Sequence, residues 1–201
     1  MERYFSVPVS ISHALVLHRL EFRNRTTRLS DAELARWHAE IDRLVPQLLP
    51  DVCFLTAPIA VNDGCAVSTA DGLCIESRSA CELLQHSSRL LLMASVCHGA
   101  APLVDAAEAS GDLARAAFVD AVASETADAG LDWIASMLKA RLLRQGCRLT
   151  TRFSAGYGDV PLSLQKVFFD RLDLAALGAS ISERFMLTPQ KSVIAFAGVI
   201  G

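Results

Sequence analysis

The chain has 201 residues, of which 52% are hydrophobic and 20% are charged, and its formal net charge at pH 7 is −3. A chain of this length can bury a substantial core, so we expect a single domain over residues 1–201. The hydrophobic content excludes a disordered chain, and the slightly acidic balance without a basic stripe gives no indication of nucleic acid or an anionic membrane surface as a partner.

The first quarter of the chain is predicted to be helical. A helix is expected over about residues 9–20. Its inward-facing candidates are Ile11, Leu15 and Leu20. A second helix begins after Ser30, which forms a capping-box pattern with Glu33. Apolar residues then follow at helical spacing as far as Pro46, at Leu34, Trp37, Ile41 and Leu44.

The middle of the chain is predicted to be rich in strands. Strands are expected over residues 52–60, 65–68 and 73–76. The last two flank Asp71-Gly72, a pair typical of hairpin turns. A short helix over residues 78–87 then leads into a buried strand over residues 90–97.

The last half of the chain begins with an Ala-rich, helix-favouring stretch over residues 101–143, with breaks expected near Gly111 and Gly130. The elements expected after it are a strand over residues 147–153, a helix after Pro161, and strands over residues 185–187 and 192–199. Helices and strands alternate without a regular βαβ period. We therefore predict an α+β fold, with a mixed, largely antiparallel central sheet and flanking helices.

Neither the N-terminus nor any apolar run predicts a targeting signal or a membrane span. Residues 1–5 contain no apolar h-region. The longest apolar run, residues 90–97, is interrupted by Ser95 and is far shorter than the roughly 20 residues that cross a bilayer. We therefore expect a cytoplasmic protein that does not associate with membranes.

The cysteines and histidines predict no metal site. The six cysteines include no C-x-x-C pair, which argues against a zinc ribbon and a thioredoxin-type redox site. Most lie in apolar stretches, as Cys53 and Cys74 do, so we expect reduced, buried and inert thiols. The five histidines include no pair spaced i, i+4 on a predicted helix.

The sequence also lacks the common signatures of catalysis. It contains no Gly-x-Ser-x-Gly elbow, no Walker loop and no Gly-x-Gly-x-x-Gly fingerprint. Gly156-Tyr157-Gly158 lacks the third glycine of that fingerprint. No catalytic residue is therefore predicted, and a Rossmann-type methyltransferase is disfavoured.

One segment groups residue types suited to a ligand with both a carboxylate and a flat ring. Arg152 shares the polar face of its predicted strand with Arg148, and a guanidinium can hold a carboxylate through two hydrogen bonds. Gly156 permits a close backbone approach or a positive φ, and Tyr157 adds an aromatic plane with a polar tip. These groups would suit an amino-acid nucleoside. By themselves, however, they are more typical of a strand end followed by a structural glycine turn.

The motif Arg-x-x-x-Gly-Tyr at residues 152–157 is similar to the S-adenosylmethionine-binding motif in the activation domain of cobalamin-dependent methionine synthase. Residues 152–166 also place a Pro and a Lys in that family's register. The sequence departs from the family at Gly158-Asp159, where Pro-Ala is usual. Other stretches that resemble the family are residues 91–99, 120–124 and 174–196, and the resemblance is clearest over residues 147–201.

The resemblance implies a methionine synthase activation domain-like fold and roles for several residues. Arg152 is the expected partner of the methionine carboxylate of S-adenosylmethionine. Gly156 and Tyr157 are expected to contact its nucleoside through backbone and ring. Glu125 and Asp128 are both candidates for an acidic contact, and the sequence does not choose between them.

The function implied by the resemblance is that of an accessory component rather than a self-sufficient enzyme. In this family, oxidised cobalt(II) is reduced again and trapped by methyl transfer from S-adenosylmethionine, which the domain positions over the cobalt. The Asp-x-His-x-x-Gly signature of cobalamin binding is absent here. Cobalamin is therefore expected only on a corrinoid-bearing methionine synthase core that acts in trans. A flavodoxin or ferredoxin-type electron donor is implied by the resemblance alone.

Two other functions remain open from the sequence. One is an interaction or reactivation protein for another corrinoid protein, with little or no S-adenosylmethionine binding. The other is an unrelated S-adenosylmethionine-dependent methyltransferase that acts on a small molecule, which the missing Rossmann fingerprint disfavours.

Overall fold

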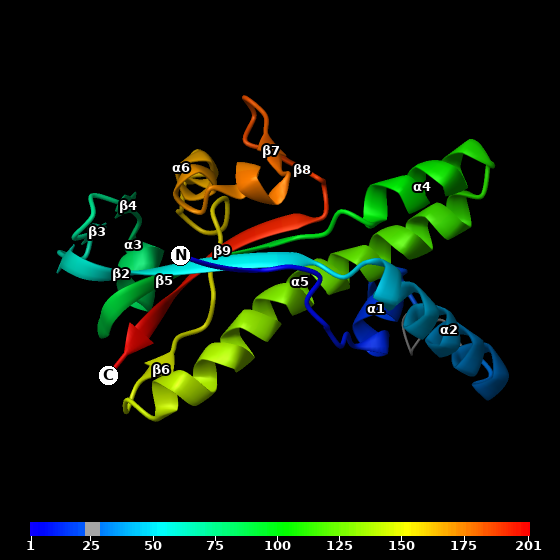
Figure 1. Ribbon diagram of the computed structural model, residues 1–201, viewed down its shortest axis with the longest axis horizontal. Coiled ribbons are helices and arrows are strands. Elements are labelled where there is room, and N and C mark those ends of the chain that lie inside the picture. Colours follow the sequence, from blue (N-terminus) through cyan, green and yellow to red (C-terminus); the bar gives the residue numbers. More distant parts are fainter. Residues whose placement is uncertain (23–28) are drawn as a thin grey trace.

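The computed structural model describes residues 1–22 and 29–201, and these form a mixed α+β architecture around a central antiparallel sheet (Figure 1). The strands are β1 (Glu2–Tyr4), β2 (Asp51–Asn62), β3 (Ala66–Thr69), β4 (Cys74–Glu76), β5 (Ser87–Val96), β6 (Arg148–Leu149), β7 (Ser180–Ile181), β8 (Leu187–Thr188) and β9 (Ser192–Ile200). The helices are α1 (His13–Arg19), α2 (Asp31–Leu44), α3 (Arg78–Leu83), α4 (Ala100–Ala109), α5 (Leu113–Leu143) and α6 (Leu164–Arg171), with 3-10 turns η1 (Val45–Gln47) and η2 (Leu174–Leu177). The predicted α+β fold is confirmed.

The strand β5 lies in the interior of the central sheet, between β2 and β9. The strand order is β4-β3-β2-β5-β9-β6, with β1 paired to the first part of β2, and all of these pairs are antiparallel. Met93 of β5 lies opposite Phe54 on one side and Ala195 on the other. Both faces of the sheet are covered here, which explains why residues 90–94 of β5 are continuously apolar instead of alternating. The predicted strand near residues 185–187 is β8, which pairs with β7 outside this sheet.

Helix α5 packs along one face of the sheet (Figure 1). Its residues Leu131, Ile134 and Leu138 are buried in a cluster with apolar side chains of β2, β5 and β9. The expected break at Gly130 is wrong, because α5 continues through this residue without interruption. A Cβ at Gly130 would lie 2.2 Å from Ser95 Oγ, so glycine is needed for the close approach of α5 to β5. The break predicted near Gly111 is confirmed, since its φ of +78° separates α4 from α5.

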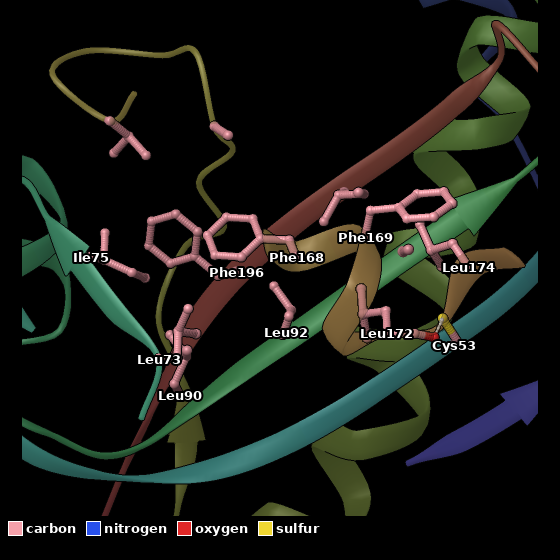
Figure 2. Close-up of a cluster of buried hydrophobic side chains, with 14 of the residues drawn as sticks. Cys53, Leu73, Ile75, Leu90, Leu92, Phe168, Phe169, Leu172, Leu174 and Phe196 are labelled. Atoms are coloured by element: carbon pink, nitrogen blue, oxygen red, sulfur yellow. Dashed lines mark hydrogen bonds between the residues drawn. The ribbon is translucent and has the colours of Figure 1, made fainter. Parts of the chain in front are cut away.

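The opposite face of the sheet is covered by the C-terminal part of the chain. Figure 2 shows Phe168, Phe169, Leu172 and Leu174, from α6 to η2, packed over Leu90, Leu92 and Phe196 of the sheet. Fully burying a side chain of this kind contributes about 1.5–3 kcal/mol. This cluster also includes Ala155 and Val160, so it holds both ends of the loop that follows β6.

Helices α1, α2 and α4 gather at the N-terminal half of α5, beside the sheet (Figure 1). The capping box of α2 is confirmed, since Ser30 N–H donates to Glu33 Oε2 at 2.8 Å and Glu33 N–H donates to Ser30 Oγ at 3.3 Å. The inward face predicted for the first helix is wrong at Leu15, which is exposed, whereas Val16 and Leu17 are buried. The helix begins only at His13, after the Ser12 cap, and is therefore short, with Val16 and Leu17 as its buried residues.

The predicted strand over residues 147–153 is shorter than expected and contains a register shift. Leu149 lies opposite Val199, but Phe153 lies opposite Phe196, so four steps along one strand match three along the other. At the irregularity, Thr150 Oγ1 accepts a hydrogen bond of 2.8 Å from Gly198 N–H. A one-residue shift reverses the faces of a strand. Leu149 and Arg152 consequently both contact the α5 side, whereas Phe153 packs in the cluster on the opposite face, so the regular alternation predicted for this strand is wrong.

In the described part of the chain, no helix combines the length and the apolarity that crossing a membrane requires.

Candidate functional site

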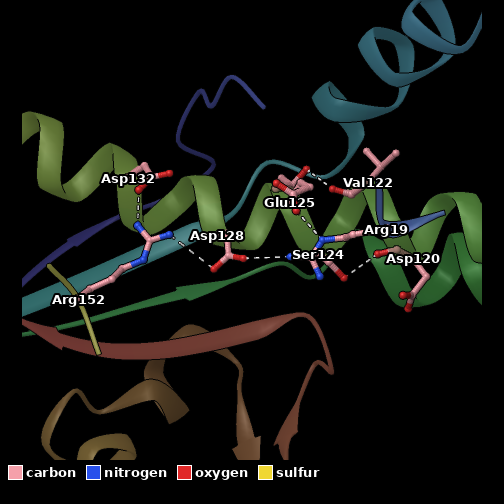
Figure 3. A network of polar contacts seen from close by, with 9 residues as sticks. Arg19, Asp120, Val122, Ser124, Glu125, Asp128, Asp132 and Arg152 are labelled. Carbon is pink, nitrogen blue, oxygen red and sulfur yellow. Dashed lines mark hydrogen bonds and ion pairs between the residues drawn. The ribbon is translucent and has the colours of Figure 1, made fainter. Parts of the chain in front are cut away.

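The register shift after β6 directs Arg152 toward two carboxylates on α5. Arg152 forms a hydrogen-bonded ion pair with Asp132, and its Nη2 lies 3.8 Å from Asp128 Oδ1 (Figure 3). Asp128 and Asp132 are four residues apart on α5 and therefore lie on the same helix face. The Arg152 side chain remains 33% exposed, so a ligand can reach the guanidinium.

The carboxylates of α5 continue as a row beyond the Arg152 pair. Asp128 is shared between Arg152 and Arg19, whose Nη2 lies 3.2 Å from Asp128 Oδ2. Arg19 also pairs with Glu125, and Asp120 pairs with Lys191 at 2.6 Å. Three separate segments thus supply the cations for one helix face, and Figure 3 shows two of these cations, Arg19 and Arg152. The exposed pairs among these, such as Arg19 with Asp128, contribute little to stability individually, but together the pairs determine where positive charge lies around α5.

Beyond Arg152 the chain forms a compact loop with Tyr157 at its tip. Gly156 has φ +86°, and its N–H donates to Val160 O at 2.9 Å, while Val160 N–H donates to Tyr157 O at 3.0 Å. Ala155 and Val160 are buried and anchor the two ends of the turn. Tyr157 is 68% exposed. Gly156 therefore makes the turn that presents the tyrosine ring, and its own N–H is engaged within the loop.

A cleft of about 310 Å³ joins these features. Its polar lining comes from Asp128 on α5, Arg152, Ser154 and Tyr157 in the loop after β6, Gln165 on α6 and Ser192 at the start of β9. The cleft volume lies at the lower end of the about 300–1,000 Å³ typical of ligand sites. The structure thus brings Arg152 and Tyr157 to one cleft, with Gly156 in the turn between them.

The two acidic candidates occupy different places. Asp128 lines the cleft and is 42% exposed. The Glu125 side chain is only 11% exposed and pairs with Arg19, one helical turn away. Of the two, Asp128 is the carboxylate next to Arg152.

Gln165 and Ser192 were not predicted as site residues. Gln165 Nε2 donates to Phe185 O at 2.7 Å, and Ser192 Oγ donates to Pro189 O at 2.7 Å, so both side chains are fixed by backbone carbonyls. Ser192 belongs to the Pro-x-x-Ser-Val pattern in the segment that resembles the methionine synthase family, and this was the available signal. Gln165 lies within the resembling stretch as well, but no chemical pattern distinguishes it.

The thiols agree with the sequence prediction only in part. Cys53, Cys81 and Cys97 are buried and reduced, and burial raises the pKa of Cys53 to about 12 and that of Cys97 to about 11. The expectation of burial is wrong for Cys74, which is exposed because its neighbour Ile75 takes the inward position of β4. Cys65 is exposed too. Within residues 1–22 and 29–201, no three His, Cys, Asp or Glu side chains are grouped as metal ligands.

Among the comparisons with known proteins, only the comparison of structures gives a match. No family model matches the sequence, and no curated protein matches it either. The structure is similar to a crystal structure of the MetH reactivation domain bound to AdoHcy, with a TM-score of 0.72 and 14% sequence identity. The match covers 94% of this chain and 73% of the other chain. At this identity the likeness concerns the fold, and the resemblance in fold predicted from the sequence is confirmed.

Proposed function

We propose that the protein binds S-adenosylmethionine in the cleft beside Arg152 and supports the reductive reactivation of a corrinoid-bearing partner. One observation carries the proposal: Arg152, Asp128 and the exposed ring of Tyr157 line a single cleft. The fold gives this grouping its context, because the similar MetH reactivation domain was crystallised with AdoHcy bound.

The charges in the cleft fit the amino-acid end of the ligand. Arg152 offers a planar donor fork for the α-carboxylate, and Asp128 offers an acceptor for the α-ammonium group. In the structure these two side chains face each other, with Nη2 and Oδ1 3.8 Å apart. A zwitterion that displaces this contact gives each side chain a partner of opposite charge, so neither charge is left unpaired.

The other side of the cleft fits the nucleoside end. Tyr157 presents an exposed aromatic plane on which a purine can stack. Gln165 and Ser192 are held by backbone carbonyls, which limits the directions in which their remaining polar groups point. A flat base and a ribose therefore meet one ring and two oriented polar side chains.

The chain's own contribution is to position the donor. S-adenosylmethionine supplies a methyl group on a sulfonium, and no side chain of the cleft is required to act as a nucleophile. Arg152 and Asp128 hold one end of the ligand beside α5, and Tyr157 at the tip of the loop holds the other end. Orientation of this kind can supply a large share of a rate enhancement. The cobalamin would be carried by a methionine synthase core in trans, and a flavodoxin or ferredoxin-type protein would donate the electron.

A second candidate is an interaction protein for another corrinoid system with little S-adenosylmethionine binding. One observation favours it: Arg152 already pairs with Asp132 and Asp128, so a ligand carboxylate has to compete for the guanidinium. A Rossmann-type methyltransferase is not supported, because the central sheet is antiparallel instead of doubly wound and parallel.

Calorimetric titration separates the first two candidates. We expect S-adenosylmethionine and S-adenosylhomocysteine to bind comparably, because the proposed contacts involve the amino acid and the nucleoside rather than the methyl group. Adenosine, which lacks the zwitterion, should bind more weakly. Flat titrations with both ligands at millimolar concentration would remove the binding proposal and leave the interaction protein.

The reactivation role needs its own assay. The chain would be mixed with a methionine synthase core that lacks its activation domain, a reductant and S-adenosylmethionine, and the corrinoid absorbance would be followed over time. We expect conversion of cobalt(II) to methylcobalamin only when the chain is present. Identical traces with and without the chain would exclude this role for that partner. Corrinoid in the isolated chain would overturn the in-trans arrangement.

A further inference from the structure

The carboxylate of Asp159 binds the beginning of α3, a segment about 80 residues earlier in the chain. It accepts hydrogen bonds from Ser77 Oγ at 2.6 Å, from Arg78 N–H at 2.7 Å and from Ser79 N–H at 3.2 Å. Ser77 is itself buried and caps α3 by accepting from Ala80 N–H at 3.0 Å. Asp159 stands two residues after Tyr157. The loop is therefore connected to α3 directly beside its exposed tip.

These contacts keep the carboxylate charged. Hydrogen bonds from Ser77 and Ser79 hold the pKa of Asp159 well below its usual range. Because the folded-state pKa is lowered, the contribution of this group is present above its unfolded pKa and is lost only as pH falls toward the lowered value. The connection to α3 thus persists through the mildly acidic and neutral range.

The remainder of the loop is packed on the α3 side but free on the cleft side. A Cβ at Gly158, where φ is +55°, would lie 3.2 Å from Phe153 Cζ and 3.3 Å from Ser79 Oγ, so the backbone there is close to both. Tyr157, by contrast, is 68% exposed. With so little packing around its ring, the position of Tyr157 is set mainly by the backbone that carries it.

We propose that Asp159 is a positioning residue of the cleft: by holding the loop on α3, it fixes the turn of Gly156 and the place of the Tyr157 ring. The inference rests on the proposed function, since it assigns Asp159 to the same ligand site. Asp159 does not line the cleft, so its effect on a ligand must pass through the loop. A ring held in place before binding loses less freedom on binding.

The first test needs no ligand. In the wild-type protein, the Gly156 amide donates to Val160 O and should be protected from hydrogen exchange. We expect Asp159→Ala to reduce this protection by about ten-fold or more, because the loop then opens locally. Asp63→Ala is the matched control: Asp63 is an exposed aspartate that accepts from Cys65 N–H and Ala66 N–H, both at 2.8 Å, but it holds a hairpin instead of this loop. Unchanged hydrogen exchange of the Gly156 amide in Asp159→Ala would show that Asp159 does not hold the loop on α3, and it would overturn the proposal.

The second test is a double-mutant cycle for S-adenosylhomocysteine affinity, measured by calorimetry. Asp159→Ala should weaken binding by about five- to ten-fold in the wild-type background, as expected for one side chain that must be ordered on binding. In the Tyr157→Ala background it should change the affinity by less than about two-fold, because its effect passes through that ring. In the Arg152→Ala background it should have its full effect. Equal effects in all three backgrounds would show general destabilisation and overturn the positioning role.

A milder variant protects the test against a failure to fold. Asp159→Asn keeps one acceptor oxygen but turns an amide group toward Arg78 N–H, so it should fall between wild type and Asp159→Ala in both measurements. Wild-type affinity for Asp159→Asn would count against the proposal. A wild-type protein that binds no S-adenosylhomocysteine would refute the proposed function, and the exchange measurement would still decide whether Asp159 holds the loop.

Discussion

The two walls of the cleft are built in different ways. The α5 wall belongs to a 31-residue helix with a buried side on the sheet, and it presents Asp128 and Asp132 one helical turn apart. The opposite wall is a loop with two positive-φ glycines, held by buried residues at its ends and by Asp159 on α3. The helix fixes charge by its own regular geometry, whereas the loop depends on contacts with distant parts of the chain.

This difference assigns separate tasks to the walls. Recognition of a zwitterion needs charges at a fixed spacing, and a rigid element supplies this more accurately than a loop. Recognition of a flat ring needs a facing aromatic plane instead of paired charges, so a loop that holds an exposed tyrosine in place can supply it. Removing a charged group at the helix wall, either Asp128 or the Arg152 guanidinium beside it, should therefore cost more affinity than changing the tip of the loop.

The largest expected effect on binding is that of Arg152→Ala. Loss of a charge-assisted pair costs about 1.5–3 kcal/mol, which is about one to two decades in S-adenosylhomocysteine affinity. Arg152→Lys should recover only part of this, since an ammonium cannot reproduce the planar fork. Calorimetric dissociation constants for the two variants measure both effects.

Arg148→Ala is the matched control for that prediction. Arg148 is an exposed arginine of the same segment, but it precedes the register shift and does not line the cleft. Its replacement should leave the affinity nearly unchanged. Equal losses for Arg148→Ala and Arg152→Ala would show that general positive charge matters and not this guanidinium.

The next largest effect is on stability and concerns the helix wall. Gly130→Ala should destabilise the protein by about 1–3 kcal/mol, although alanine favours helices, because the new Cβ would overlap Ser95 Oγ. Thermal or urea unfolding measures the change. Adding Ser95→Ala should restore part of the loss, since it removes the nearest obstructing atom. Full stability of Gly130→Ala alone would show that α5 does not need this close approach.

These elements show which features can be predicted from sequence. The capping box at Ser30 and most of the strands and helices between α1 and β9 depend on local patterns, although β7 was not predicted. The register shift near Thr150 and the contacts of Asp159 depend on partners far along the chain. Periodicity carries no information about such partners, so a regular strand was predicted where the structure has a bulge.

Replacing the acidic residue that lines the cleft should have a moderate effect on ligand affinity. Asp128→Asn should weaken S-adenosylhomocysteine binding by about ten-fold, because an amide replaces the acceptor for the ligand ammonium. Glu125→Gln should have a much smaller effect, since Glu125 pairs with Arg19 away from the cleft. The comparison requires that both variants retain wild-type unfolding temperatures. A larger loss with Glu125→Gln than with Asp128→Asn would reverse the assignment.

The smallest effects on ligand affinity are expected at the tip of the loop, where the Tyr157 ring should matter more than its hydroxyl. An exposed ring that stacks on a purine contributes through its plane, about 0.5–1.5 kcal/mol, or roughly three- to ten-fold in affinity. Tyr157→Ala should lose this contribution, whereas Tyr157→Phe keeps the plane and should stay within about two-fold of wild type. Neither change should affect stability much, because the side chain is 68% exposed.

Calorimetry with S-adenosylhomocysteine and with adenosine should show the same loss of affinity for Tyr157→Ala, because the ring contacts the nucleoside that the two ligands share. A loss confined to S-adenosylhomocysteine would place Tyr157 at the amino-acid end, beside Arg152, and would remove the division of tasks between the two walls.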